Sequence, residues 1–246
     1  MLPSFSNSSE KLNPLLESLA ERIRSQMSQL PQLSLLKTGS EWESIVGVFE
    51  GESLLITNEL HRCTGMRKLH LEIAQIGRRL QILHCVFFPE PTFDLPIFGV
   101  DVVAGPGGVS AAIVDLSPVG SDLPRQIRLG LEELAIPSFS QERELPVWGS
   151  IFSQYVRFIR PIGIEEESSF LDLVDDYLLI LRRAVDTVQE DSLDSSFTIK
   201  RYQGQRFYCL QQKRNDKTRL VLQKAFNPLW AERYIEKILF DEPPPL

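Results

Sequence analysis

The 246-residue sequence has few residues that could cross-link the chain or hold a structural metal. Its cysteines, Cys63, Cys85 and Cys209, are odd in number, widely spaced and never form a C-x-x-C pair. A disulfide framework and a structural zinc site are therefore not expected, and the cysteine content fits a reducing compartment.

The sequence also lacks an apolar run long enough to span a membrane, and its first residues show no signal-peptide layout. Basic residues are outnumbered, since 26 Lys and Arg against 33 Asp and Glu give a net charge of −7. Because phosphate binding needs a dominant cationic surface, nucleic acid is not the expected partner. We expect a cytoplasmic protein that binds neither nucleic acid nor a membrane.

Glycine motifs for nucleotides are missing as well, and no dinucleotide-binding fingerprint is present. The run Gly105-Pro106-Gly107-Gly108 has no following Lys-Ser/Thr and no strand-loop-helix context, so a phosphate loop is not expected. It favours a tight turn before a strand at 109–116. Its bare backbone lets a ligand approach closely, with Ser110 just beyond.

Four successive strands are predicted between residues 67 and 115, with ionisable residues where a sheet core should be apolar. Residues 68–74 alternate between apolar and polar. Residues 80–88 are apolar on both faces except at Gln81 and His84, and residues 97–104 except at Asp101. A buried histidine and aspartate are unfavourable unless they are partnered or used.

The hairpin connections predict how these polar residues align. A turn centred on Gly77 places His70 opposite His84, and a loop over residues 89–96 places His84 opposite Asp101. The three side chains then form a row on one face of the sheet, with Glu72 two residues along it. A slip of one residue would move a member to the other face, so this register is a hypothesis.

Three interpretations of the row remain open from the residues alone. It is a hydrogen-bonded polar pair in a sheet core, a metal site, or an acid–base site. A flat row suits a tetrahedral metal poorly, whereas adjacent titratable groups in an apolar site push their pKa values apart. Asp101 is expected to be the carboxyl most affected by desolvation, because its strand is apolar on both faces. Cys85 adjoins His84 but points to the opposite face, so it is expected in the core.

Helical spacing of apolar residues predicts how the sheet is covered. We expect an α+β protein, a three-layer α/β/α sandwich with a mainly antiparallel sheet, in a single domain over residues 1–246. A pocket is expected between the polar row and the C-terminal helices. The predicted elements are helices at 13–30, 124–134, 165–188 and 218–239, a further helix beginning in 201–212, and a hairpin of 42–49 with 53–60. Residues 148–159 are open between helix, strand and one after the other, and residues 241–246 are expected to be unstructured.

A basic cluster, KRNDKTR at residues 213–219, has two interpretations. It is a solvated helix start, or it is an anion site in which Lys217 and Arg143 hold ligand carboxylates. The cluster could equally receive an acidic protein.

Long stretches of the sequence resemble the ferredoxin-dependent bilin reductases. They are HCVFFPEP, LPIFGVDVVAGPGGVSAAIVDLSP, RELPVWGSIFSQYVRFIRP and NDKTRLVLQKAF…WAERY, and the resemblance covers residues 54–240. It implies an α/β/α sandwich that binds biliverdin IXα between the sheet and the C-terminal helices. It also implies four-electron reduction through bilin radicals, with single electrons from a 2Fe-2S ferredoxin, protons from the protein, and no bound metal or flavin. A monomer is expected.

The resemblance also assigns catalytic roles at matching positions. The acid of the HLE motif falls on Glu72, which would protonate the D-ring vinyl group. His84 and Asp101, in the HCV and GVD motifs, would donate protons to the tetrapyrrole and its A ring, and His70 would support them by hydrogen bonding. Relatives that make other bilins typically lack this glutamate and histidine, so the expected product is phycocyanobilin.

Substrate contacts are implied by the same resemblance. Ser110, Arg143 and Lys217 fall on positions that resemble propionate contacts, and Asn215 and Val221 on positions beside the ligand. Three alternatives are weighed against this function: a bilin reductase with another product, a non-catalytic tetrapyrrole carrier, and a metal-dependent hydrolase.

Overall fold

The computed structural model describes residues 11–77 and 79–246. The first residues, on which the expectation of no signal peptide rests, lie outside this range, as does Arg78 of the first predicted turn. Within the described ranges, no helix is both long enough and apolar enough to cross a membrane.

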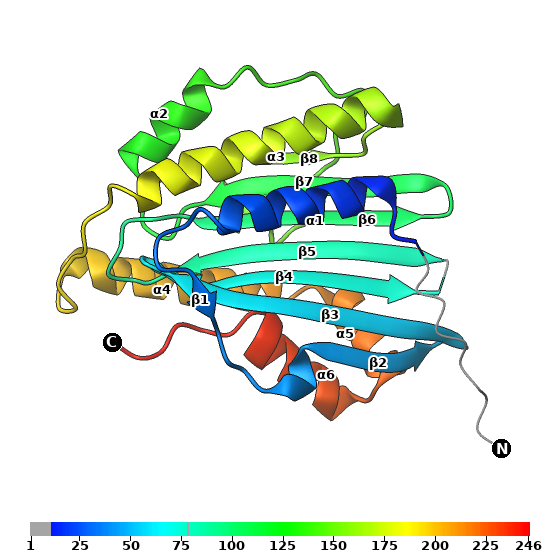
Figure 1. The fold of residues 1–246 in the computed structure, drawn as a ribbon. Helices are drawn as coiled ribbons and strands as arrows, with labels where there is room; N and C mark the ends of the chain where they lie inside the picture. Colours follow the sequence, from blue (N-terminus) through cyan, green and yellow to red (C-terminus); the bar gives the residue numbers. More distant parts are fainter. Residues whose placement is uncertain (1–10, 78) are drawn as a thin grey trace.

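One eight-stranded sheet runs through the molecule, and all its strand pairs are antiparallel (Figure 1). The strand order is β1-β3-β4-β5-β6-β7-β8, and β2 also pairs with β3. The predicted hairpin and the four predicted central strands are confirmed. The strands are β1 (Ser34–Leu35), β2 (Ser44–Phe49), β3 (Glu52–Cys63), β4 (Met66–Ile76), β5 (Leu80–Pro89), β6 (Ile97–Gly105), β7 (Gly108–Ser117) and β8 (Arg157–Ile159).

Helices cover both faces of this sheet, which confirms the α+β class and the α/β/α layering (Figure 1). On one face lie α1 (Pro14–Met27) and α3 (Gly163–Val185), with α2 (Arg125–Glu133) packed against α3. On the other face lie α4 (Ser196–Gln212), α5 (Asp216–Ala225), α6 (Pro228–Tyr234) and a π-helical turn, Ile235–Leu239. Two short 3₁₀ turns are at Ser40–Trp42 and Gly149–Ile151. Residues 148–159 thus contain a helical turn followed by strand β8.

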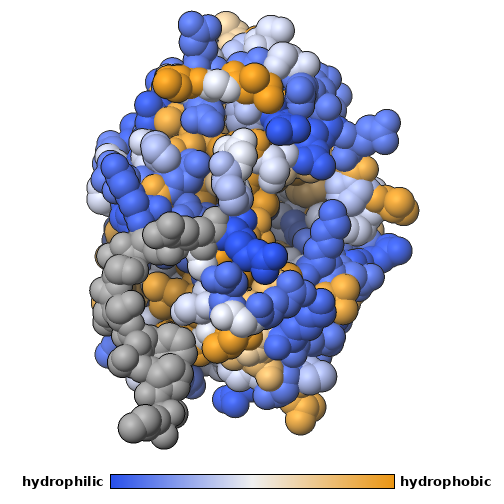
Figure 2. All heavy atoms as spheres, turned by 90° about the vertical axis from the view of Figure 1, so that its right-hand side faces the viewer, coloured by the Kyte–Doolittle hydropathy of each residue, from blue (hydrophilic) through white to orange (hydrophobic). Residues whose placement is uncertain are grey.

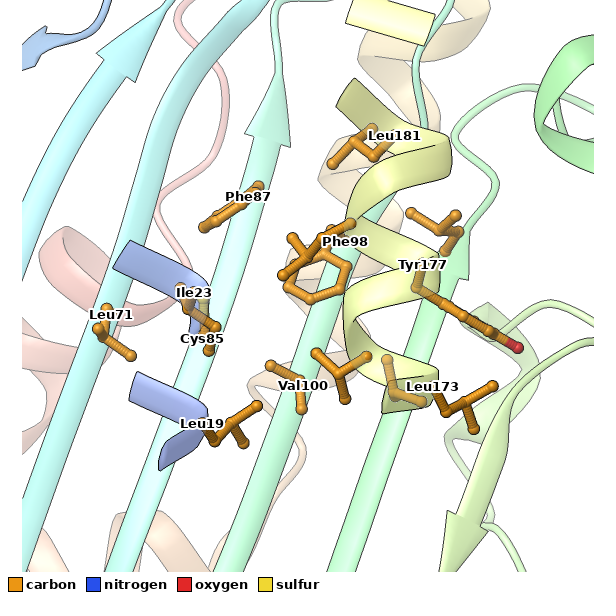
Figure 3. Packing of buried hydrophobic residues seen from close by; sticks show 14 of the residues in the cluster. Leu19, Ile23, Leu71, Cys85, Phe87, Phe98, Val100, Leu173, Tyr177 and Leu181 are labelled. Atoms are coloured by element: carbon orange, nitrogen blue, oxygen red, sulfur yellow. The ribbon is translucent and has the colours of Figure 1, made fainter. Parts of the chain in front are cut away.

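The α1–α3 layer packs as its sequence pattern predicts. Asn13 caps α1, because its Oδ1 accepts a hydrogen bond from the Leu15 amide at 2.9 Å, and Pro14 follows as the first helical residue. Leu19 and Ile23 of α1 then point toward the sheet beside Cys85 (Figure 3). Cys85 is fully buried there, which confirms its expected place in the core.

The C-terminal part differs from the sequence prediction in three ways. The helix expected to begin within residues 201–212 already begins at Ser196. The single helix predicted at 218–239 is divided, because Asn227 begins a new helix: its Oδ1 accepts from the Trp230 amide at 2.9 Å, and Pro228 follows. The prediction that residues 241–246 are unstructured is wrong for the first two. Asp241 accepts a hydrogen bond from Arg67 at 2.6 Å, and Glu242 is held by a cation of α4. These partners are distant in sequence, so the local composition did not reveal them.

The predicted register of the first central hairpin is wrong, whereas that of the second is confirmed. Glu72, not His70, pairs with His84, because the connection runs from Ile76 to Leu80 and is not centred on Gly77. His84 pairs with Asp101 as expected. The register error is two residues, which leaves every side chain on its predicted face. The row therefore contains Glu72, His84 and Asp101.

Candidate active site

The polar row lies on the sheet face that carries α4–α6. Glu72, His84 and Asp101 are direct neighbours on β4, β5 and β6, and His70 lies two residues from Glu72 along β4. Strand alternation puts all four on one face. The structure thus brings together the four residues with expected catalytic roles.

His84 and Asp101 form the closest charged pair of the row. The His84 Nδ1 lies 2.5 Å from the Asp101 Oδ1, and the exposed fractions of the two side chains are 12% and 41%. Burial disfavours the charged imidazole, but the negative charge of Asp101 and its hydrogen bond outweigh this and raise the pKa of His84. The pair therefore favours an imidazolium bound to a carboxylate. Within the described residues the buried His84 Nε2 has no partner, so it is free to meet a ligand.

Glu72 is the desolvated carboxyl of the row. Glu72 is only 8% exposed, and its Oε2 lies 2.6 Å from the Tyr234 hydroxyl. Burial raises the pKa of Glu72. The expectation that Asp101 is the carboxyl most affected by desolvation is therefore wrong, because β6 is left open to the surface at Asp101 while helix α6 covers Glu72.

His70 is a neutral support of the row. Its Nε2 lies 2.7 Å from the Asn58 Oδ1, and its ring centroid is 5.9 Å from that of His84 in an edge-to-face arrangement. Burial lowers the pKa of His70 well below its usual value, and the neighbouring Lys68 lowers it further.

The middle of this sheet face is not fully covered by helices. Half-exposed residues alternate with buried ones along the central strands, and the half-exposed set faces α4–α6. This set is Ile82, His84, Gly99, Asp101, Val103 and Ile113. Figure 2, which looks onto the right-hand end of the molecule in Figure 1, shows a hollow with hydrophobic surface inside it. An apolar floor with a few convergent polar groups is the usual composition of a small-molecule site.

The residues with expected substrate contacts fall into two groups. Ser110 and Arg143 meet, because the Arg143 Nη1 donates to the Ser110 carbonyl at 2.5 Å, and the guanidinium lies over the Phe158 ring. The Ser110 hydroxyl donates to the carbonyl of Val103, a residue of the open floor.

The second group lies on α5, where Asn215 caps the helix, Lys217 is exposed in its first turn and Val221 is half-buried. The basic cluster does lie at the start of a helix. In the part of the chain that the structure describes, no hydrogen bond or ion pair links the two groups.

Several residues of the site were not found from the sequence. Tyr234 of α6 and Asn58 of β3 connect Glu72 to His70, and Phe240 lies edge-on to His84 with ring centroids 5.6 Å apart. Asn58 had a detectable signal, because it interrupts the otherwise apolar alternation of Leu54, Ile56 and Leu60 on its strand. Tyr234 and Phe240 had none, since an aromatic residue on an apolar helix face is ordinary core.

Two buried cations of β4 hold the C-terminal segment against the row. The Lys68 ammonium donates to the Ile238 and Leu239 carbonyls at 2.9 and 3.2 Å and pairs with Asp241, to which Arg67 also donates. Burial lowers the pKa of Lys68, although the charge of Asp241 opposes this. The anchor positions the π-helical turn, and with it Phe240, beside His84. Among residues 11–77 and 79–246, no three His, Cys, Asp or Glu side chains lie where they could share a metal ion.

Comparison with known proteins agrees with this architecture. The family model of the ferredoxin-dependent bilin reductases matches residues 20–241, so the chain belongs to that family. The crystal structure of selenomethionine phytochromobilin synthase from tomato, in complex with biliverdin, superposes with a TM-score of 0.70 at 19% identity, covering 92% of this chain and 83% of that one. The shared fold is therefore that of a bilin reductase.

Relatives within the family carry a more specific name, phycocyanobilin:ferredoxin oxidoreductase. The protein of that name from Prochlorococcus marinus (strain MIT 9313) is 61% identical over 246 residues, which is 100% of this chain and 93% of the relative. That from Synechococcus sp. (strain CC9902) is 54% identical over 244 residues, covering 99% of each.

Proposed function

We propose that this protein reduces biliverdin IXα to phycocyanobilin with electrons from reduced ferredoxin, as one bilin reductase domain over residues 1–246. The observation that carries the proposal is the row of Glu72, His84 and Asp101 at the edge of an uncovered apolar sheet face. The names of the relatives that match the whole chain support the same reaction. The tetrapyrrole would lie on the apolar floor, between the sheet and the C-terminal helices.

The proposed catalytic step is protonation of a pigment that has just gained an electron. An added electron makes an extended tetrapyrrole more basic, so acids at its edges protonate it without a hydride carrier. Glu72 would serve the D-ring vinyl group, and the His84–Asp101 pair the tetrapyrrole and its A ring. Each electron is matched by one proton, and an apolar surrounding that excludes water protects the radical intermediates.

The proposed substrate contacts use the two groups on either side of the floor. Arg143 and Ser110 on the β7 side and Lys217 on α5 are suited to the two propionate carboxylates. Asn215 and Val221 would contact the pigment from α5. A flexible Lys217 side chain, exposed in the ligand-free protein, is long enough to close over a bound anion.

The proposed ferredoxin site is the basic surface of α4 and α5. Residues 196–225 contain eight Lys and Arg against one Asp, a net charge of +7 in a chain whose total is −7. Ferredoxins are acidic, and complementary charge steers weak, salt-sensitive association. In the described chain, Arg206 and Lys213 pair with Glu242, and Arg219 pairs with Glu232, while Arg214 has no carboxylate partner. Arg214 is exposed and has no proposed role in substrate binding, so it is suited to a test of this surface.

The test is the absorption spectrum of the protein with biliverdin, before and after addition of a ferredoxin reducing system. We expect a bound-pigment spectrum first, and phycocyanobilin as the final product. A different bilin product would replace the proposal by another bilin reductase activity. Binding without reduction would indicate a tetrapyrrole carrier. If the protein neither bound nor reduced biliverdin, the proposal would be contradicted.

A further inference from the structure

Only one arrangement of protons satisfies every hydrogen bond behind Glu72. The arrangement begins at Asn58, whose Nδ2 donates to the Trp42 carbonyl at 2.6 Å. Because a carbonyl only accepts, this contact fixes the orientation of the Asn58 amide. Its Oδ1 must then be the atom that faces the Nε2 of His70 at 2.7 Å and the hydroxyl of Tyr234 at 2.8 Å.

An amide oxygen has no proton to give, so both of its neighbours must donate to it. His70 therefore carries a proton on Nε2, and its buried Nδ1, which has no partner within the described residues, is the unprotonated nitrogen of a neutral ring. Tyr234 has a single hydroxyl proton, and the contact with Asn58 uses it.

One contact remains, between the Tyr234 hydroxyl oxygen and the Glu72 Oε2 at 2.6 Å. Since the proton of Tyr234 already points to Asn58, Glu72 must be the donor here, which requires a protonated carboxyl. If Glu72 were ionised, Tyr234 would turn its proton to the carboxylate, leaving two oxygen atoms 2.8 Å apart with no hydrogen between them.

The groups that face Glu72 from the neighbouring elements act in opposite directions. Burial, the largest influence, and the negative charge of Asp101 on β6 favour the acid, while the positive charge of His84 on β5 and a hydrogen bond donated by Tyr234 favour the carboxylate. Lys68 and His70 lie on the same strand, and Asn58 and Tyr234 approach from β3 and α6. The hydrogen-bond network adds a geometric preference to this electrostatic balance.

We propose that Tyr234 and Asn58 form a two-position hydroxyl relay that keeps Glu72 protonated in the ligand-free protein. When Glu72 gives its proton to a substrate, the Tyr234 O–H rotates from Asn58 to the new carboxylate, and no proton leaves Tyr234. Tyr234 is thus a positioning residue for the acid. The role of the relay in turnover rests on the proposed function, whereas the protonation of Glu72 at rest does not.

The test is infrared spectroscopy of the ligand-free full chain as a function of pH. At neutral pH the wild type should show the C=O stretching band of a protonated carboxylic acid that Glu72→Gln lacks. Tyr234→Phe removes the partner of this acid and should shift the band. Tyr177→Phe is the matched control, because Tyr177 is an equally buried tyrosine on the opposite face and donates to the Tyr155 carbonyl.

Asn58→Leu provides a second, independent readout. Without the Asn58 oxygen, the Tyr234 hydroxyl is free to donate its hydrogen bond to Glu72. This stabilises the carboxylate, so the band should disappear at a lower pH than in the wild type. A wild-type spectrum with no band that depends on Glu72 would overturn the inference. So would an equal band shift in Tyr177→Phe, or an unchanged midpoint in Asn58→Leu. If the band behaves as expected while Glu72→Gln turns over normally, the inference stands and the catalytic role of Glu72 is wrong.

Discussion

At the scale of single residues, burial and pairing divide the row into groups with different protonation. Glu72 is covered by α6 and its pKa is raised, whereas His84 holds its charge because Asp101 lies 2.5 Å away. Glu72 as a neutral acid and His84 as an imidazolium can each donate one proton, and they lie at different positions beside the open apolar floor. This is the arrangement that protonation of a large pigment at separate edges requires.

Glu72→Gln tests the first of these protons, because it keeps shape and burial but removes the acid. Biliverdin should still bind, while phycocyanobilin formation should fall by about 10²- to 10⁴-fold, leaving the D-ring vinyl group unreduced. The products are separated by chromatography and identified by absorbance. Glu167→Gln on α3, a partly buried carboxyl on the opposite face, is the control and should react normally. Wild-type yields of phycocyanobilin from the Glu72 variant would contradict the role.

Asp101→Asn tests the paired proton. Removing the carboxylate leaves burial as the dominant influence on His84, so the pKa of His84 should fall and the imidazole should be neutral near pH 7. The pigment bound to this variant should lose the pH-dependent absorbance change of the wild type, and radical species should accumulate on reduction.

A pH series of absorption spectra for the wild type, Asp101→Asn and His84→Gln measures this titration. Because the two groups are coupled, the His84 variant should disturb the same titration. If Asp101→Asn titrates and turns over like the wild type, Asp101 is only a structural partner of His84.

At the scale of elements, the C-terminal helices separate two tasks. The π-helical turn after α6 is fixed to β4 through Lys68 and Asp241, and thereby holds Phe240 on His84. Helices α4 and α5 instead present basic side chains to the surface. Anchoring and partner binding therefore depend on different residues and can be changed one at a time.

Asp241→Ala tests the anchor. It leaves Arg67 and Lys68 buried without their carboxylate, which should lower the free energy of unfolding by about 2–3 kcal/mol, less than for a fully buried pair because Asp241 is partly exposed. Urea denaturation measures the change. Glu242→Ala, which breaks the more exposed pair with Arg206, should lower it by less than about 1 kcal/mol. Equal losses of unfolding free energy in the two variants would show that the burial of Arg67 and Lys68 does not increase the contribution of their ion pairs to stability.

Charge reversal on α4–α5 tests the docking surface. Arg214→Glu should slow ferredoxin-dependent turnover by about 3- to 10-fold at low salt and flatten its salt dependence, because rim charges act mainly on association. Biliverdin binding should be unchanged. Arg183→Glu at the end of α3 makes the same change of charge on the other layer and should behave like the wild type. Identical turnover of both variants at all salt concentrations would point to another surface.

At the scale of the whole molecule, the two layers of the sandwich are packed differently. The sheet face under α1 and α3 is packed with buried hydrophobic side chains (Figure 3), whereas the face under α4–α6 has half-exposed residues at its centre. Asp115 joins β7 to the segment after the turn Gly149–Ile151, because its carboxylate accepts hydrogen bonds from the Ser153 amide and hydroxyl and from the Ser117 hydroxyl. This link is buried, so the stability of the fold depends on its protonation.

The free energy of unfolding should therefore contain a component that falls as the pH rises. Burial raises the pKa of Asp115 from 3.8 to about 6, so the folded state binds more protons than the unfolded state between these values. The contribution is complete below pH 4 and lost through pH 6, a change of about 3 kcal/mol.

Urea unfolding of the wild type and Asp115→Asn across this range measures the component. As the pH rises through this range, the free energy of unfolding of the wild type should fall by that amount relative to that of Asp115→Asn. A difference that does not depend on pH would contradict the raised pKa.

Much of this protein could be predicted from its sequence, because alternation and helical spacing are local properties of the chain. They identified the central strands, the α/β/α layers and the face on which His70, Glu72, His84 and Asp101 lie. The register error between β4 and β5 did not harm this face assignment, since a shift of two residues keeps side chains on the same side. The family resemblance added chemical roles that the residue pattern alone left open.

Only the tertiary structure decided which carboxyl is buried and what surrounds it. Glu72 and Asp101 lie in the same row on one face of the sheet, and their environments differ because α6 covers one while the sheet is open at the other. Tyr234, Phe240 and Asp241 reach the site from the far end of the chain. Desolvation and hydrogen bonding depend on distances between such remote segments, and a pattern within one strand or helix carries no information about them.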